Sequence, residues 1–312
     1  MKKVSVVMCT FNGEKYLKEQ LDSILNQTYP LEELIIQDDC STDSTLDIIK
    51  EYQKKYPIIK WFLNEEKKGV NENFFSVMHK AKCEYIAVSD QDDIWELDKI
   101  EKQVNTIGNH LLCFGSSRFF CDSETLKSDK KAPNYSLVRF VFLNMISGHT
   151  MLINSRLLQL IPFRSDLVLY DYWLGLTAAC HNSIIYCDGI ICNHRIHDNN
   201  QTFNNENVEK KNTPIDVLLS SLKIRKQLKQ EAKTFFSSMH SFISQTRVET
   251  KETREAKKIA SLMANTSWLS TIKAMIFCLF HRDKVLDNES SKITALIKAP
   301  LFPFQCYHFF NF

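Results

Sequence analysis

The sequence lacks the markers of several common protein classes. It contains neither a G-x-G-x-x-G turn nor a G-x-x-x-x-G-K loop, which argues against a dehydrogenase and a P-loop nucleotidase. Its ten cysteines form no C-x-x-C pair and are scattered through apolar runs, a pattern typical of reduced, mostly buried thiols. Because the formal net charge is only +2, the charge balance gives no general reason to expect a nucleic acid partner.

Long apolar runs are also lacking. The best candidate, Trp268–Phe280, is shorter than a membrane-crossing helix and carries Lys273. A strand-like apolar run begins at Val4, which leaves no room for a charged leader with a cleavage site. We therefore expect a cytoplasmic chain.

The first hundred residues alternate between two hydrophobic periods. Short apolar runs typical of buried strands lie at residues 4–8, 34–36, 58–63 and 85–88. Between them, residues 16–25, 44–52 and 73–81 carry apolar side chains at helical spacing. This alternation predicts an α/β fold with a mostly parallel sheet and helices on both faces.

The pattern is less regular after residue 98. It predicts a helix at 100–107, a strand at 111–114, an exposed loop at 127–133, a strand followed by a helix at 147–158, and a helix at 170–180. Residues 184–197 read as a pair of strands separated by the turn signal Asp188-Gly189. A polar, Asn-rich stretch then suggests a boundary near residue 205, with a catalytic domain at 1–205 and a helical region at 206–312.

Polar groups follow three of the predicted strands. They lie at residues 10–14, 38–43 and 89–93, and the last group contains Asp90, Asp92 and Asp93. The carboxyl ends of parallel strands meet at one edge of a sheet, where α/β proteins bind their ligands. Crowded carboxylates are tolerated when a cation or hydrogen-bond donors neutralise them, so the sequence predicts a metal-bound nucleotide diphosphate at this edge. The alternative is an Asp-rich turn without a ligand.

Three segments of this half carry a resemblance to a known family. The segments VSVVMCTFNGEKYLKEQLDSILNQTYP, ELIIQDDCSTDST and YIAVSDQDDIWELDKI resemble the N-terminal half of inverting family 2 glycosyltransferases with the GT-A fold. Further on, SGHTMLIN, YDYWLGLTAAC and IIYCDGIICNHRIHDNNQT resemble the rhamnosyltransferase-like subgroup. The resemblance implies a GT-A fold, which is a Rossmann-like mixed sheet flanked by helices. The helical C-terminal region is expected as an extension of this fold.

The resemblance also implies roles for residues of the donor site. Asp39 resembles the aspartate that contacts the nucleoside, and Thr10, Asn12 and Glu14 would line the same pocket. Asp90 and Asp92 resemble the D-x-D pair, with Asp92 as a direct ligand of Mn²⁺ or Mg²⁺ and Asp90 near both metal and diphosphate. The alternative for Asp39 is a cap or turn before the helix at residue 44, which Asp38 or Asp43 could equally provide.

An inverting displacement needs a base that takes the proton of the acceptor hydroxyl. Asp171 resembles the catalytic acidic residue of the family, and a helix N-cap is the alternative. Asp166 is the second choice for the base.

Further residues of the second half complete the expected site. His197 resembles a C-terminal histidine that completes metal or diphosphate binding, with His194 as a competitor, and Arg195 could pair with the diphosphate. His149 falls on the expected acceptor side beside Gly148. Stacking on sugar rings would suit Trp95 and Trp173, although a core position is the common alternative for tryptophan.

The C-terminal region is rich in aromatic and basic residues. Residues 268–280 and 301–312 fit peripheral contact with the inner face of the cell membrane. Packing against the catalytic domain and dimerisation are equally open alternatives.

Together these observations predict a metal-dependent transferase. We expect it to move a sugar from a dTDP- or UDP-sugar to a glycan or a lipid-linked saccharide, in the synthesis of a bacterial surface polysaccharide. The alternatives are a sugar-1-phosphate nucleotidyltransferase and a non-catalytic subunit that binds nucleotide sugars or glycans.

Overall fold

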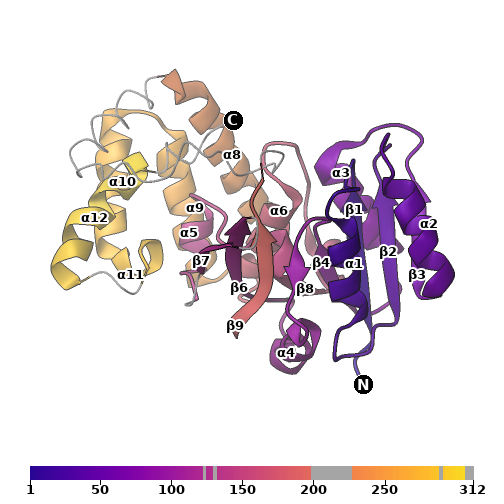
Figure 1. The fold of residues 1–312 in the computed structure, drawn as a ribbon. Coiled ribbons are helices and arrows are strands. Elements are labelled where there is room, and N and C mark those ends of the chain that lie inside the picture. Colours follow the sequence, from indigo (N-terminus) through magenta and orange to yellow (C-terminus); the bar gives the residue numbers. More distant parts are fainter. Residues whose placement is uncertain (122–123, 129–131, 198–226, 288–290, 306–312) are drawn as a thin grey trace.

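The computed structural model describes residues 1–121, 124–128, 132–197, 227–287 and 291–305 (Figure 1). The strands in these residues are β1 Val4–Thr10, β2 Glu33–Asp38, β3 Ile59–Leu63, β4 Tyr85–Ser89, β5 Ile94–Trp95, β6 Leu112–Cys121, β7 Glu124–Ser128, β8 Met151–Asn154 and β9 Ile184–Arg195. The α-helices are α1 Leu17–Leu25, α2 Thr45–Lys55, α3 Gly69–Lys80, α4 Lys99–Ile107, α5 Leu137–Phe140, α6 Tyr170–Cys180, α8 Lys229–Gln245, α9 Lys251–Ala264, α10 Trp268–Phe280, α11 Arg282–Val285 and α12 Lys292–Gln305. Two 3-10 helices lie at Gly148–Thr150 and Ser155–Leu160.

The described strands form one mixed sheet in the order β3-β2-β1-β4-β8-β6-β9-β5, with β7 paired to β6. Strands β1 to β4 are parallel to one another, whereas β8 is antiparallel to both β4 and β6. The βαβ units predicted from the hydrophobic periods are therefore confirmed. Because the strands of these units are parallel, the carboxyl ends of β1, β2 and β4 lie at one edge of the sheet.

Alternating residues of the strands pack into two hydrophobic cores, one on each face of the sheet. Val6 of β1 packs on the face that α1, α2 and α4 cover, whereas Val7 packs on the face of α3 and α6. The period of two along a strand produces this division. The near-continuous burial of β1 and β2 explains why the sequence shows apolar runs there rather than alternation.

Two expectations for the later chain are wrong. Residues 184–195 form the single strand β9, and Asp188-Gly189 lies within it instead of making a turn between two strands. The pairing of β9 with β6 shifts there, since Phe114 pairs with Tyr186 and Ser116 with Ile190, and Gly189 has φ +96°. The dipeptide is therefore absorbed as a bulge, which glycine permits. Residues 127–128, expected in a loop, belong to β7 because they pair with the extended end of β6; residues 129–131 lie outside the described residues.

The C-terminal helices pack against the same core as α6. Phe242 of α8 stacks on Trp173 of α6 with ring centroids 4.8 Å apart, and Phe302 of α12 meets Phe142 edge-on at 5.1 Å. Phe302, in the aromatic C-terminal region, thus packs back on the part of the chain expected as the catalytic domain, as one of the sequence alternatives held. The proposed boundary near residue 205 lies outside the described residues.

Candidate active site

The loops that follow β1, β2 and β4 contact one another at the carboxyl edge of the sheet. The backbone N–H of Asn12 donates to Ser41 Oγ at 2.8 Å, and that of Phe11 donates to Gln91 Oε1 at 2.9 Å. The three polar groups expected at this edge are therefore brought together. They form a connected surface on which a ligand could rest.

Three residues expected to line the nucleotide pocket hold these loops in place. Thr10 Oγ1 donates to Asp38 Oδ2 at 2.7 Å, Asn12 Oδ1 accepts from the N–H of Thr42 at 2.9 Å, and Glu14 Oε2 accepts from the N–H of Ser44 at 2.8 Å. Asn12 and Glu14 remain exposed on the outer side of the loop, while Thr10 is buried. Their contact with a nucleotide remains a prediction.

The carboxylate of Asp39 is held at the start of α3. It accepts from the backbone N–H groups of Lys68 and Gly69 at 2.7 and 2.9 Å and from Asn64 Nδ2 at 2.7 Å. The turn before α2 is held instead by two neighbouring aspartates, because Asp38 Oδ1 accepts from the N–H of Ser41 and Asp43 Oδ1 from that of Thr45. Asp39 is thus not needed for that turn, and it joins the β2 loop to the N-terminus of α3.

Asp92, in the loop after β4, lies beside His197, which follows β9. Asp92 Oδ2 is 2.9 Å from His197 Nε2. Burial, together with the charges of Asp93 and Asp90, raises the pKa of Asp92 to about 6, against the opposing effect of His197. A carboxylate whose ionised form is disfavoured by neighbouring carboxylates is suited to a cation. Two of the predicted metal ligands are therefore adjacent, and the charge of Asp90 acts on Asp92.

Asp93 is buried and paired with His194. Its Oδ1 lies 2.8 Å from His194 Nδ1 and accepts from the N–H of Arg195 at 3.1 Å. Burial alone would raise the pKa of Asp93, but His149 and His194 outweigh it and hold the pKa at about 2. Burial would lower the pKa of His194, yet Asp93 raises it to about 9. Between the two candidate histidines, His194 is therefore the partner of Asp93 and His197 the partner of Asp92.

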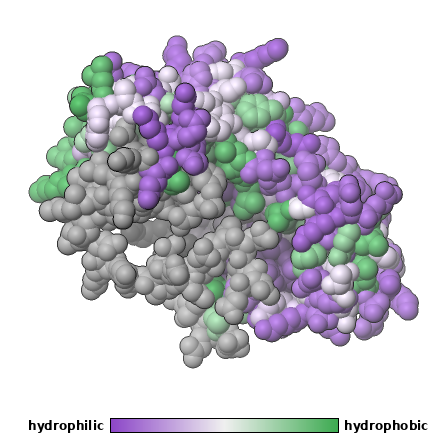
Figure 2. All heavy atoms as spheres, turned by 90° about the horizontal axis from the view of Figure 1, so that it is seen from above, coloured by the Kyte–Doolittle hydropathy of each residue, from purple (hydrophilic) through white to green (hydrophobic). Residues whose placement is uncertain are grey.

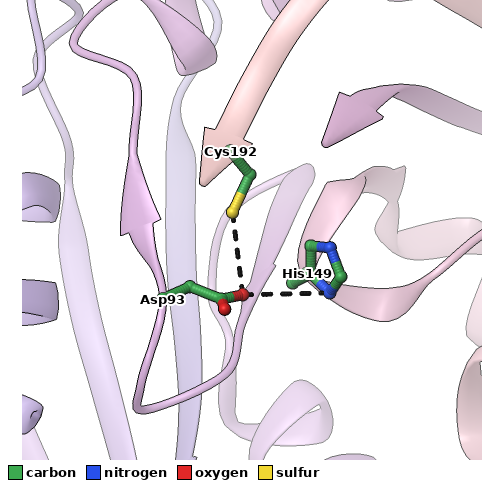
Figure 3. Close-up of side chains that lie close together, drawn as sticks. All are labelled: Asp93, His149 and Cys192. Atoms are coloured by element: carbon green, nitrogen blue, oxygen red, sulfur yellow. Dashed lines mark hydrogen bonds and ion pairs between the residues drawn. The ribbon is translucent and has the colours of Figure 1, made fainter. Parts of the chain in front are cut away.

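A second set of possible metal ligands lies next to this pair. Asp93, His149 and Cys192 point toward one another from three separate elements, with their ligand atoms within 4.8 Å (Figure 3). Cys192 Sγ lies 3.6 Å and His149 Nδ1 3.8 Å from Asp93 Oδ2. His149 also stacks on His194 with ring centroids 4.5 Å apart, and its Nδ1 is 3.6 Å from Asp90 Oδ2. His149, expected on the acceptor side, therefore contacts the loop of Asp90, Asp92 and Asp93 after β4, which we call the acidic loop.

Arg195 donates a hydrogen bond to the backbone of the acidic loop. Its Nε donates to the carbonyl oxygen of Asp92 at 3.0 Å, and its Nη2 contacts Glu19 Oε2 at 2.8 Å. The guanidinium lies between the rings of Tyr16 and Phe120, at 4.4 and 4.6 Å from their centroids. These contacts fix the backbone of Asp92. The expected contact of Arg195 with a diphosphate stays a prediction.

Asp171, the candidate base, occupies the first turn of α6. Its Oδ2 accepts from the backbone N–H of Gly148 at 3.2 Å. Burial and then the charge of Asp90 raise the pKa of Asp171 to about 7, although the Gly148 N–H opposes this. The N-cap residue of α6 is Leu169, so Asp171 does not occupy the cap position, although the N–H groups of Asp171 and Tyr172 in the first turn also lower its pKa. Asp166, the second choice, is exposed and bonded to Asn71 Nδ2 at 3.1 Å.

The sequence did not identify every residue of this region. The Lys99 ammonium is buried and donates to the carbonyl oxygen of His149 at 2.5 Å, and burial lowers its pKa to about 8. Lysine in a helix is ordinarily exposed, so no local signal could have found this contact. Trp95 and Trp173 are both buried in the core, the alternative to stacking on sugars, and Lys99 Nζ lies 3.5 Å from the Trp95 ring centroid.

Comparisons with known proteins bear on the family and the fold of the chain. The family model described as Glycosyl transferase family 2 matches residues 5–184. A dTDP-rhamnosyl transferase, RfbG of Shigella flexneri, is 32% identical over 212 residues, which are 62% of this chain and 73% of that protein. The putative teichuronic acid biosynthesis glycosyltransferase TuaG of Bacillus subtilis is 39% identical over 101 residues, 32% of this chain and 40% of that protein.

A solved structure shares the fold. The mannosyltransferase PcManGT of Pyrobaculum calidifontis, in complex with GDP-Man and Mn²⁺, superposes with a TM-score of 0.54 at 17% identity, covering 99% of this chain and 83% of its own. The predicted GT-A fold with a helical C-terminal extension is confirmed.

Proposed function

This chain belongs to glycosyl transferase family 2, and on that premise we propose that it moves a sugar, with inversion, from a nucleoside diphosphate sugar to a hydroxyl of a glycan or a lipid-linked saccharide. The observation that carries this proposal is that two adjacent residues, Gly148 and His149, contact both Asp171 and the loop of Asp90. The N–H of Gly148 donates to Asp171 Oδ2 at 3.2 Å, and Nδ1 of His149 lies 3.6 Å from Asp90 Oδ2. The loop proposed for the diphosphate and the proposed base therefore share one site, as a displacement requires.

Asp171 is the base in this proposal. With a pKa of about 7, its carboxylate can take a proton from an acceptor hydroxyl near neutral pH. The N–H of Gly148 orients Oδ2, the oxygen that we propose receives the proton. Asp39 with Thr10, Asn12 and Glu14 would hold the nucleoside side of the donor.

We propose that Mn²⁺ or Mg²⁺ is held by Asp92, Asp90 and His197. The donor set supports this choice, because carboxylate oxygens and an imidazole suit these ions, whereas the thiol of Cys192 suits a softer metal. The raised pKa of Asp92 supports it further. When bound, the ion neutralises charge on the departing nucleoside diphosphate. Arg195 keeps the Asp92 backbone in place and would lie near the same diphosphate.

The donor and the pathway are proposed from the relatives. RfbG of Shigella flexneri, a dTDP-rhamnosyl transferase, supports a dTDP-sugar, and a UDP-sugar is the other candidate. TuaG, by its name a teichuronic acid biosynthesis enzyme, supports a role in a bacterial surface polysaccharide, although this chain spans only 40% of its length. A lipid-linked acceptor would place the enzyme on the inner face of the cell membrane.

The test is release of nucleoside diphosphate from a panel containing dTDP-rhamnose, UDP-N-acetylglucosamine and GDP-mannose, with Mn²⁺ or with EDTA. Slow hydrolysis can reveal the donor when the acceptor is unknown. We expect metal-dependent release from one donor by the wild type. A thermal-shift screen on the same panel separates the remaining outcomes, since binding without release favours a non-catalytic subunit and no binding contradicts the donor site.

A further inference from the structure

The outer sides of α10 and α12 expose large apolar side chains. Those of α10 are Trp268, Leu269, Ile272, Ile276 and Phe280, and those of α12 are Ile293, Leu296 and Ile297. Phe280 and Ile293 are 73% and 74% exposed. The two helices pack against each other, so these side chains belong to one region, which we call the α10–α12 face. Apolar residues gather at the left end of the molecule in Figure 2, where these helices lie in Figure 1.

The exposure is not a consequence of loosely packed helices. The opposite side of α10 buries Ala274, Phe277 and Cys278, and that of α12 buries Ala299 and Phe302 in the main core. Each helix is therefore fixed by one apolar side and presents a second apolar side to solvent. Contiguous exposed apolar surface of this kind marks an interaction site.

The charges on these helices are of one sign. Neither α10 nor α12 contains an Asp or a Glu, whereas Lys273, Lys292 and Lys298 are exposed among the apolar residues. Apolar side chains flanked by lysines, on two helices that carry no carboxylate of their own, fit the boundary between the headgroups and acyl chains of an anionic bilayer. A second copy of the chain fits less well, because neither helix offers a carboxylate of its own to pair with the lysines of the other copy across a two-fold interface.

The helices are also of a length for surface contact. With 13 residues, α10 is about 20 Å long, less than the hydrocarbon core of about 30 Å. None of the helices among the described residues is long and apolar enough to cross a membrane.

We propose that the α10–α12 face binds the surface of an anionic lipid bilayer, with its apolar side chains among the acyl chains and its three lysines at the headgroups. The purpose of this contact rests on the proposed function, since it would hold the active site near a lipid-linked acceptor. The contact itself can be measured without any sugar donor.

The experiment is co-sedimentation of the full chain with vesicles of pure phosphatidylcholine and of equimolar phosphatidylcholine and phosphatidylglycerol. One triple variant carries Lys273→Gln, Lys292→Gln and Lys298→Gln, and another carries Ile272→Ser, Ile276→Ser and Leu296→Ser. Because all six side chains are exposed, both variants should fold. The matched controls are Lys54→Gln in α2 and Leu97→Ser, an exposed leucine distant from the C-terminal helices.

We expect the wild type to bind the anionic vesicles more tightly than the neutral ones. Each lysine removed should weaken that binding about fivefold, the apolar triple should weaken it at least about tenfold, and the controls should leave it unchanged. Equal binding to both vesicles, or unchanged binding by both triples, overturns the proposal. So does a wild type that ignores vesicles and forms a dimer that the apolar triple dissociates, because the occupant is then a second copy.

Donor release measured without vesicles separates this inference from the proposed function. Vesicle binding by a protein that releases no nucleotide contradicts the proposed function and leaves the bilayer contact standing. Release without vesicle binding contradicts the bilayer contact alone.

Discussion

The backbone N–H of Gly148 donates to Oδ2 of Asp171 over 3.2 Å. This bond joins the turn before β8 to the first turn of α6, and it fixes the oxygen that we propose takes the acceptor proton. The same turn is held from its other side by Lys99, which donates to the carbonyl oxygen of His149. The geometry of the proposed base thus depends on a turn that also contacts the acidic loop.

Replacing Asp171 by Asn should lower the transfer rate about 10²- to 10⁴-fold, the usual contribution of a general base. In the wild type the rate should rise as the pH increases toward about 7, because the base acts in its ionised form, and then level off. The measurement is a pH profile of kcat/KM with the true acceptor. Because the folded pKa is raised from 3.8 to about 7, ionisation of Asp171 lowers the stability as the pH rises through this range, and the loss is complete above pH 7. The variant should therefore melt no lower than the wild type at pH 8. A variant that keeps the wild-type rate would show that Asp171 is not the general base.

Substitution of Gly148 by Ala should distort this turn. A Cβ at Gly148 would meet the Tyr170 hydroxyl, the nearest of several atoms of that ring in its way. We expect a loss of about 1 to 3 kcal/mol of stability, the usual cost of overpacking, with a fall in activity. Adding Tyr170→Phe removes the closest contact and should recover part of the unfolding free energy in urea. No recovery in the double variant would show that another contact carries the cost.

Asp39 is expected to affect both folding and donor binding. Asp39→Asn loses acceptor capacity for two backbone N–H groups at the start of α3 and should cost about 1 to 3 kcal/mol of stability. Asp43→Asn is the matched control, because Asp43 also accepts backbone N–H groups in the neighbouring loop. If Asp39 contacts the nucleoside, only its variant should lose the thermal shift that a nucleotide sugar produces. Equal losses in both variants would leave Asp39 with a structural role alone.

The buried pair of Asp93 and His194 should stabilise the acidic loop. Removing either charge, as in Asp93→Asn or His194→Gln, leaves its partner buried without compensation, which typically costs about 3 to 5 kcal/mol. The double variant should be more stable than the sum of the single losses predicts. A double-mutant cycle measured by urea unfolding tests this, and additive losses would contradict the pairing.

The hydrophobic pattern of the sequence predicted the parallel half of the sheet and its helices. The alternation of hydrophobic periods located β1 to β4 and their helices, because each element of a βαβ unit is amphipathic or buried in a characteristic way. The Asp188-Gly189 signal failed since pairing with β6 overrides the local turn preference. The hydrophobic face of α10 was visible in the sequence, but its division into a buried and an exposed side depends on the position of α12.

In the candidate site, too, the sequence identified individual residues but not the contacts between them. Asp90, Asp92 and Asp93 stand together in the sequence, and the family resemblance singled out His197. The contacts that decide their surroundings join residues far apart in the chain, such as Asp93 with His194 or Asp39 with Gly69. Such contacts depend on the order of strands in the sheet, which a single sequence does not reveal. The stacking of His149 on His194 is a further case.

The most direct test of the account is Mn²⁺ binding followed by electron paramagnetic resonance, with and without UDP or dTDP, in the wild type and three variants. The account predicts that Asp92→Ala and His197→Ala lose bound Mn²⁺, whereas Cys192→Ser keeps it. Loss of Mn²⁺ in Cys192→Ser with full binding in Asp92→Ala would contradict the account, since the metal would then belong to Asp93, His149 and Cys192.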